Sequence, residues 1–257
     1  MSALFKVDDI HVSYGDVEIV HGVSFDLQEG ELCALLGLNG SGKTTMMRGI
    51  CGLLSAQGRS YVNDIPLDSM SERTRARYLS FIPQISSPIQ GKTVLEVLLM
   101  GANPHLGLLE SPGKKHYDAA HRALEKLHLE EFAEKDFAKL SQGQKQLIIL
   151  ARTLVQDAPV MLMDEPDSAL DFLNRHMVLS KVHEVVKEEK KAGLITLHDP
   201  NFAMAYCDRL ILLKKGNLMA EVDMRTASAE EVKEKLSIIY GDIELLQHGS
   251  SYLMGKA

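Results

Sequence analysis

Four short apolar runs constrain the fold of this chain more than any other feature of its sequence. They occupy residues 32–36, 78–82, 160–163 and 194–197, and each is a nearly unbroken series of apolar side chains. Such runs are typical of strands that are buried on both faces of a parallel sheet. Stretches with helical periodicity lie between them, for example at residues 175–190. This alternation predicts an α/β fold with a parallel sheet.

Two further stretches predict antiparallel strands. Between residues 4 and 30, apolar and polar side chains alternate on both sides of Gly15-Asp16, which is typical of a β-ribbon. Residues 210–222 contain two apolar runs joined by Lys215-Gly216-Asn217, and we expect a hairpin there. An acidic helix is expected to follow from about Ser228.

The middle of the chain shows no strand signal. Residues 94–156 have the pattern of successive helices, so we expect a helical subdomain, about residues 85–156, inserted into the α/β core. A C-terminal segment, about residues 228–257, follows the hairpin. Because no repeat or linker divides the chain, we expect residues 1–257 to form a single domain.

Composition limits the class of protein. The chain has 257 residues, of which 45% are hydrophobic and 25% charged, and this excludes a disordered or collagen-like chain. Its formal net charge is −7, whereas a nucleic-acid-binding protein normally has a basic excess. No apolar run approaches the ~20 residues of a membrane-spanning helix, and the first residues lack a signal segment, so we expect a cytoplasmic chain. Cys33, Cys51 and Cys207 lie far apart and are expected to be buried free thiols.

The apolar run at residues 32–36 leads into a glycine-rich loop that fits the pattern G-x-x-x-x-G-K-[ST]. We expect a helix to follow, over about residues 45–54. Such a loop turns backbone N–H groups toward a phosphate, Lys43 adds a positive charge, and Thr44 offers a hydroxyl to Mg²⁺. The alternative, a chance glycine-rich turn, is disfavoured by the strand before it and the helix after it. The residues predicted to bind the nucleotide here are Gly37, Leu38, Asn39, Gly40, Ser41, Gly42, Lys43, Thr44 and Thr45.

The other three apolar runs also end in polar side chains. Gln84 follows the second run, Asp164 and Glu165 follow the third, and His198 follows the fourth. Parallel strands place their ends side by side at the edge where open α/β sheets bind ligands. Asp164 is suited to hold Mg²⁺, Glu165 to polarise water, Gln84 to approach the metal or the water, and His198 to bond the terminal phosphate. Singly, each is better interpreted as a solvated turn, a loop amide or a surface imidazole, but beside the phosphate loop they predict nucleotide hydrolysis.

A third motif, residues 140–144, precedes a strongly helical stretch. Ser141 and Gln144 have the spacing of a capping box, and this structural interpretation is sufficient by itself. A capped helix start with Gly143 beside it is also an anion site, because unpaired N–H groups and the helix dipole point outward. We therefore predict that Ser141, Gly143 and Gln144 contact the γ-phosphate.

Together these motifs resemble the ATPase subunit of ATP-binding cassette (ABC) transporters, over nearly the whole chain. In the terms of that family, residues 37–44 are the Walker A loop, residues 161–165 belong to Walker B, and residues 140–144 are the signature motif. The resemblance assigns the remaining motifs to Gln84 as the Q-loop, residues 168–171 with Asp171 as the D-loop, His198 as the switch histidine and Tyr14 as the aromatic that stacks on adenine.

The resemblance implies a fold and a mechanism. The fold is a RecA-like P-loop core with an antiparallel β-subdomain and an inserted helical subdomain. The ligands are ATP and Mg²⁺, and two copies are expected to bind ATP head to tail between the Walker A loop of one and the signature motif of the other. The implied catalytic residues are Lys43, Glu165 and His198, and the implied Mg²⁺ residues are Thr44, Gln84 and Asp164.

Finer stretches resemble a subgroup of importers for iron-siderophores, haem or cobalamin. They are residues 71–84, 93–107, 197–203 and 238–241. The chain departs from the usual pattern at four positions, with Gln142 for a glycine of the signature, Leu147 for an arginine, Asp167 for a threonine and Pro200 for a leucine. None of these changes removes a catalytic group, but Gln142 adds a side chain where the backbone would approach phosphate.

The resemblance also implies partners and a location. The transport path would belong to integral-membrane permease subunits, an extracytoplasmic solute-binding protein would act indirectly, and the chain would lie at the cytoplasmic face of the membrane. The alternatives are a soluble ABC ATPase of iron-sulfur assembly, repair or translation, an exporter subunit, and a module that binds ATP without hydrolysing it. Glu165 and His198 disfavour the last alternative.

Overall fold

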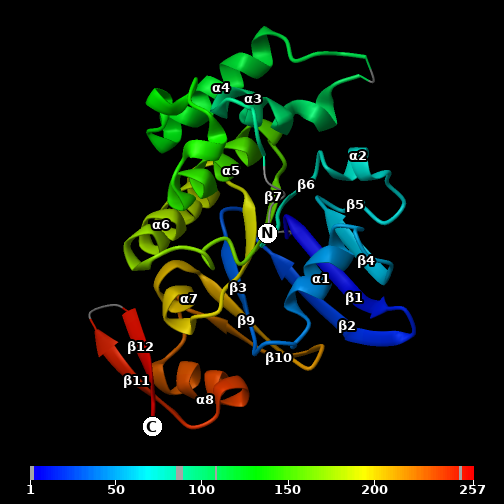
Figure 1. Cartoon of the computed structure of the whole chain (residues 1–257). Helices are drawn as coiled ribbons and strands as arrows, with labels where there is room; N and C mark the ends of the chain where they lie inside the picture. Colours follow the sequence, from blue (N-terminus) through cyan, green and yellow to red (C-terminus); the bar gives the residue numbers. More distant parts are fainter. Residues whose placement is uncertain (1–2, 85–88, 108, 249–250) are drawn as a thin grey trace.

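The computed structural model describes residues 3–84, 89–107, 109–248 and 251–257. Its centre is a six-stranded sheet with the order β10-β9-β3-β8-β7-β6 (Figure 1). Five strands run parallel, namely β3 (Leu32–Leu36), β6 (Leu79–Ile82), β7 (Val160–Asp164), β8 (Ala192–Thr196) and β9 (Arg209–Lys214), and β10 (Asn217–Asp223) is antiparallel to β9. Every residue of β3, β7 and β8 is buried, as the apolar runs predicted.

A second sheet covers one side of the molecule, with the order β2-β1-β4-β5. Its strands are β1 (Phe5–Tyr14), β2 (Val17–Leu27), β4 (Ala56–Val62) and β5 (Ile65–Pro66). The predicted ribbon is confirmed by the antiparallel pairing of β1 with β2. The helix α1 (Lys43–Ile50) lies against this sheet, and its buried methionines share one apolar core with β1, β2 and β3.

Two predicted boundaries near the sheet were wrong. The helix expected over residues 45–54 ends at Ile50, because Gly52 takes a left-handed φ of 72° and Arg75 donates to the carbonyl of Cys51 at the helix end. The run at residues 194–197 forms a strand that begins earlier and ends at Thr196, because Ala192 and Gly193 already pair with β7 and β3.

Helices cover the opposite side, at the top and left of Figure 1. Between residues 89 and 156 the described residues form helices and no strand, as predicted. They are α3 (Val94–Leu99), η1 (Met100–His105), α4 (Lys114–Leu127), η2 (Glu130–Phe132), η3 (Phe137–Lys139) and α5 (Gln142–Gln156). The first residues of the predicted insertion, 85–88, lie outside the described residues. The predicted capping box at Ser141 is confirmed, since its side chain accepts from the Gln144 N–H.

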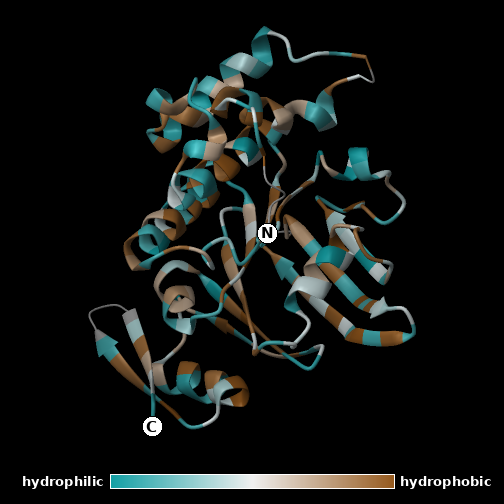
Figure 2. Cartoon of the chain, in the orientation of Figure 1, coloured by the Kyte–Doolittle hydropathy of each residue, from teal (hydrophilic) through white to brown (hydrophobic). Residues whose placement is uncertain are grey.

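Six further elements complete the described part of the chain. They are α2 (Glu72–Arg75), α6 (Phe172–Glu188), α7 (Pro200–Tyr206), α8 (Ala229–Tyr240), β11 (Ile243–His248) and β12 (Ser251–Lys256). The predicted hairpin β9–β10 and the helix after Ser228 are confirmed, whereas the hairpin β11–β12 was not predicted. Figure 2 shows the longer helices banded with hydrophobic and hydrophilic residues, and α4, α5, α6 and α8 each bury several apolar side chains.

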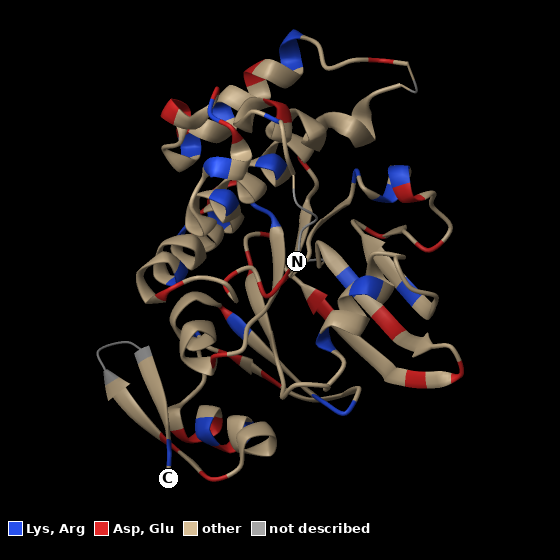
Figure 3. Ribbon diagram, viewed as in Figure 1, with Lys and Arg blue, Asp and Glu red and all other residues tan. Residues whose placement is uncertain are grey.

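Charge and cysteine placement agree with a globular chain. Figure 3 shows basic and acidic residues interspersed over α2, α4 and α8.

The three cysteines are free thiols, with Cys33 and Cys207 buried and Cys51 partly buried, and burial raises the pKa of the Cys51 thiol to about 12. None of the helices in the described ranges has both the length and the apolar character needed to cross a bilayer.

Candidate functional site

A cavity of about 360 Å³ opens at the carboxyl edge of the central sheet. The order β3-β8-β7-β6 makes four predicted segments neighbours there, because each follows one of these strands. The lining residues are Asn39, Gly40, Ser41, Gly42, Lys43, Thr44, Thr45, Gln84, Glu165 and His198. The structure therefore brings the glycine-rich loop together with the polar ends of three other strands, as the sequence predicted.

The loop is built around a buried lysine. The Nζ of Lys43 donates to the carbonyl of Gly37 at 2.8 Å, and the side chain is enclosed by the loop. Burial lowers the pKa of Lys43, while the carboxylates of Glu165 and Asp164 act in the opposite direction. Gly37 is required by close approach, since a Cβ there would lie 2.3 Å from the carbonyl oxygen of Leu213.

Ser41 provides an unsatisfied polar group inside the loop. Its hydroxyl is buried and has no partner among the described residues, while its carbonyl accepts from the Gly216 N–H at 2.8 Å. Gly42 begins α1 with a left-handed φ of 104°, which an L side chain rarely adopts. The loop thus presents the N-terminus of α1 to the cavity, and this suits an anionic oxygen.

Two threonine hydroxyls meet on one oxygen of Asp164. Oδ1 of Asp164 accepts from Thr44 of the loop at 3.1 Å and from Thr196 of β8 at 2.9 Å. The same Thr196 oxygen accepts the N–H of Glu165 at 2.8 Å. The sequence analysis gave no role to Thr196, although a lone hydroxyl within the otherwise apolar run at residues 194–197 was a usable signal.

Glu165 is the point where the strand ends converge. Its Oε2 lies 2.6 Å from Nε2 of His198 and also accepts from the amide of Gln84. Its side chain is almost fully buried, and its backbone φ is 49°, a left-handed value that is costly for a residue with a Cβ. Backbone strain of this kind concentrates at functional sites because the surrounding structure must hold it in place.

Asp167 is a buried acid that the sequence analysis recorded only as a departure from the family pattern. It is 4% exposed, and burial raises its pKa, while Arg175 and His198 act to lower it. Nε of Arg175 lies 3.9 Å from Oδ2 of Asp167 and donates to the carbonyl of Leu170 at 3.0 Å. A carboxyl group of perturbed pKa thus lies two residues beyond Glu165.

Other predicted residues lie outside this cavity. Ser141 and Gln144 bond each other at the start of α5, and a Cβ at Gly143 would meet the side chain of Asn174 in α6. Asp171 caps α6 by accepting from the Asn174 N–H. The signature segment and the segment that ends in Asp171 thus meet at Asn174. Neither segment lines the nucleotide cavity of its own chain.

Tyr14 also lies outside the lining of the cavity. It ends β1, is 46% exposed, and its hydroxyl lies 3.5 Å from Arg48 of α1. Leu38, in the phosphate loop, is exposed as well. An exposed aromatic ring is suited to stack on a base, and the role of Tyr14 stays a prediction.

A family model described as ABC transporter matches residues 20–168, which span the phosphate loop, Gln84, the signature segment and Glu165. This chain belongs to the ABC transporter family. It is similar to the hemin import ATP-binding protein of Vibrio cholerae, with 33% identity over 239 residues, 91% of this chain and 89% of that protein. Proteins of this family hydrolyse ATP, and the chain is accordingly an ATP-binding ATPase subunit.

Two solved structures extend the comparison. One is an inward-facing metal-chelate-type ABC transporter, with 28% identity and a TM-score of 0.81 over 98% of this chain and 96% of that one. The other is a dimeric bacterial ABC transporter cassette, with 28% identity and a TM-score of 0.73 over 87% of this chain and 100% of that one. The fold is therefore that of an ABC ATPase, with its helical and antiparallel β-subdomains.

Replacing Asp167 with Asn is expected to stabilise the chain at pH 7. Burial raises the pKa of Asp167 above 3.8, so the native chain holds the carboxyl proton more tightly than the unfolded chain does. The free energy of unfolding therefore falls as pH rises from 3.8 through the pKa of the native chain. The increase in the free energy of unfolding that Asp167→Asn brings should shrink as pH falls toward 3.8. Urea denaturation at several pH values measures it, with the exposed Asp16→Asn as a control. A variant less stable than the native chain at pH 7 would contradict this account.

Proposed function

We propose that this chain powers an importer of haem or an iron chelate by hydrolysing Mg²⁺-ATP at the cavity lined by the phosphate loop, Gln84, Glu165 and His198. The carrying observation is that Lys43, Gln84, Glu165 and His198, which come from four separate segments, line this one cavity. Likeness to a hemin import ATP-binding protein and to a metal-chelate-type transporter supports the substrate class, which in the family resemblance also includes cobalamin.

The residues present fit Mg²⁺. The hydroxyl of Thr44 and Oδ1 of Asp164 are oxygen donors 3.1 Å apart, and Gln84 adds an amide beside them. Mg²⁺ in phosphate-binding enzymes takes one or two carboxylates and completes its octahedron with phosphate oxygens and water, so one carboxylate suffices. Bound there, Mg²⁺ would neutralise charge on the β- and γ-phosphates.

The chain's own groups supply binding and proton transfer. Lys43 exchanges its bond to the Gly37 carbonyl for phosphate oxygens, which stabilise the charged form of the side chain that burial disfavours. Glu165 accepts a proton from the water that attacks the γ-phosphate, and His198 and Gln84 hold its Oε2 in place. Because Thr196 bonds both Asp164 and the Glu165 N–H, it keeps the metal residue and the base in fixed relation.

A second copy of the chain would complete the site. Ser141 and Gly143 do not line the cavity of their own chain, and Gly143 lies against Asn174, so their predicted contact with the γ-phosphate needs a partner. A head-to-tail dimer supplies it, and the similar dimeric cassette supports this arrangement. In the same proposal, permease subunits bind the dimer at the cytoplasmic face of the membrane. A solute-binding protein delivers the substrate to the permease from the opposite face of the membrane.

Replacing Glu165 with Gln should keep nucleotide binding and strongly slow turnover. The amide preserves the size of the side chain but cannot accept the proton of water, and the expected loss in rate is about 10²- to 10⁴-fold. Phosphate release measures turnover, and size exclusion with ATP should show a persistent dimer. Asp16→Asn, which removes an exposed carboxylate elsewhere, is the control. Turnover near that of the native chain would rule out Glu165 as the base.

Deleting this chain should abolish growth of its source cell on haem or an iron chelate as the only iron source. Restoring the native chain should rescue growth. Restoring the Glu165→Gln variant should not, because a dimer that closes on ATP and cannot hydrolyse it does not reopen for another transport cycle. Unchanged growth on both iron sources, with uptake of labelled haem and siderophore intact, would contradict the importer proposal and favour a soluble ABC ATPase or an exporter subunit.

A further inference from the structure

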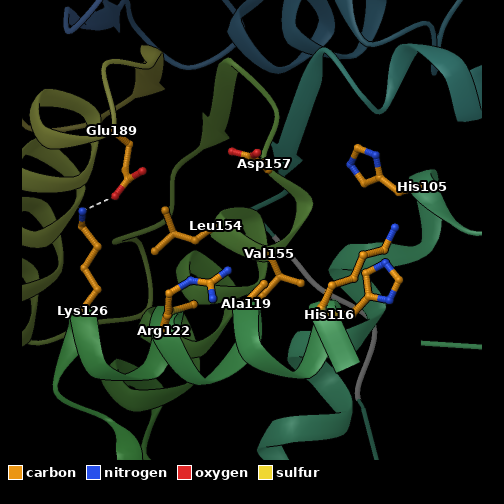
Figure 4. A pocket seen from close by; sticks show the side chains of 11 residues that line it. His105, His116, Ala119, Arg122, Lys126, Leu154, Val155, Asp157 and Glu189 are labelled. Carbon is orange, nitrogen blue, oxygen red and sulfur yellow. Dashed lines mark hydrogen bonds and ion pairs between the residues drawn. The ribbon is translucent and has the colours of Figure 1, made fainter. Parts of the chain in front are cut away.

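A second cavity, of about 450 Å³, lies in the helical region and shares no lining residue with the nucleotide cavity. It is bounded by α4, the end of α5, His105 of η1 and Glu189 at the end of α6 (Figure 4). Its apolar lining consists of Ala119, Ala123, Leu154 and Val155. Because two of these four are alanines, the contact between α4 and α5 leaves space that larger side chains would have filled.

Cationic side chains surround this apolar lining. Lys115, Arg122 and Lys126 come from α4, and in Figure 4 the guanidinium of Arg122 extends across the cavity toward Val155. Lys126 is neutralised by Glu188, at 3.1 Å, and by Glu189. Within the described part of the chain, Lys115 and Arg122 have no such carboxylate partner.

The acidic groups at the cavity are already engaged. Glu189 pairs with Lys126, and Oδ1 of Asp157 lies 3.4 Å from Nζ of the buried Lys191. Among the described residues, Lys115 and Arg122 are therefore the cations of this cavity that have no ion-pair partner of their own. Such a pair of cations over an apolar surface fits an anion that carries an organic group.

His116 adds a buried donor without an acceptor. Its side chain is 8% exposed, and its Nδ1 accepts the N–H of Gly113 at 2.9 Å. Since Nδ1 is an acceptor, the proton of the neutral ring is on Nε2, and Nε2 has no partner among the described residues. His116 lines the cavity, so an acceptor oxygen bound there would satisfy this group.

We propose that this cavity binds a small phosphomonoester. The guanidinium fork of Arg122 matches two phosphate oxygens, Lys115 adds a second positive charge, and His116 donates to the phosphoryl group. The organic part of the ester lies on the surface formed by Ala119 and Leu154. This site is separate from the ATP cavity and would give the transporter subunit a second phosphate ligand.

Titration calorimetry with phenyl phosphate tests the site, in the presence of saturating ADP so that the nucleotide cavity is occupied. The native chain should bind saturably, and Arg122→Gln should weaken binding about tenfold or more because a charge-assisted contact is lost. Ala119→Leu, which fills the apolar surface, should weaken it as strongly. Lys114→Gln, an equal loss of charge outside the lining on the same helix, should leave binding unchanged. Inorganic phosphate should bind several-fold more weakly than phenyl phosphate.

Three results would overturn the proposal. The first is that phenyl phosphate does not bind saturably when ADP is present. The second is that Arg122→Gln weakens binding no more than Lys114→Gln does. The third is that inorganic phosphate and phenyl phosphate bind with equal affinity. None of them depends on ATP hydrolysis. A chain that fails to hydrolyse ATP would contradict the proposed function and leave the outcome of this titration unaffected.

Discussion

The two threonine hydroxyls on Oδ1 of Asp164 fix the relation on which the rest of the site depends. Thr44 comes from the phosphate loop, Asp164 from the end of β7 and Thr196 from the end of β8, so three segments distant in sequence meet at one oxygen. Thr196 also accepts the N–H of Glu165, which sets the direction in which the chain leaves β7. The strand order makes this possible, because β3, β8 and β7 are neighbours with their carboxyl ends at the same edge.

Several features around this point are unfavourable in a chain without ligand. Lys43 is buried with a lowered pKa, the Ser41 hydroxyl has no partner among the described residues, and Glu165 has a left-handed backbone. Each costs free energy that packing elsewhere must offset. Bound phosphate would relieve the first, because phosphate oxygens stabilise the charged form of Lys43, which burial disfavours.

Much of this arrangement could be predicted from the sequence. The apolar runs predicted the parallel strands because strands buried on both faces tolerate few polar residues. The polar ends of those runs predicted the cavity, since strand ends in a parallel sheet lie together. Thr196 and Asp167 could not be assigned in this way, because their roles depend on which strand neighbours which and on burial by α6. The α1 boundary failed for a similar reason, since Arg75 contacts the helix end from a distant segment.

The central claim is that one hydrolytic site needs the phosphate loop of one copy and Ser141 of another. Mixing a Lys43→Ala chain with a Ser141→Arg chain tests it most directly, because each tagged heterodimer then holds one intact composite site and one doubly defective site. Each variant alone should release no phosphate from ATP. The purified heterodimer should recover a substantial part of the native rate. A heterodimer as inactive as its parents would contradict the head-to-tail arrangement.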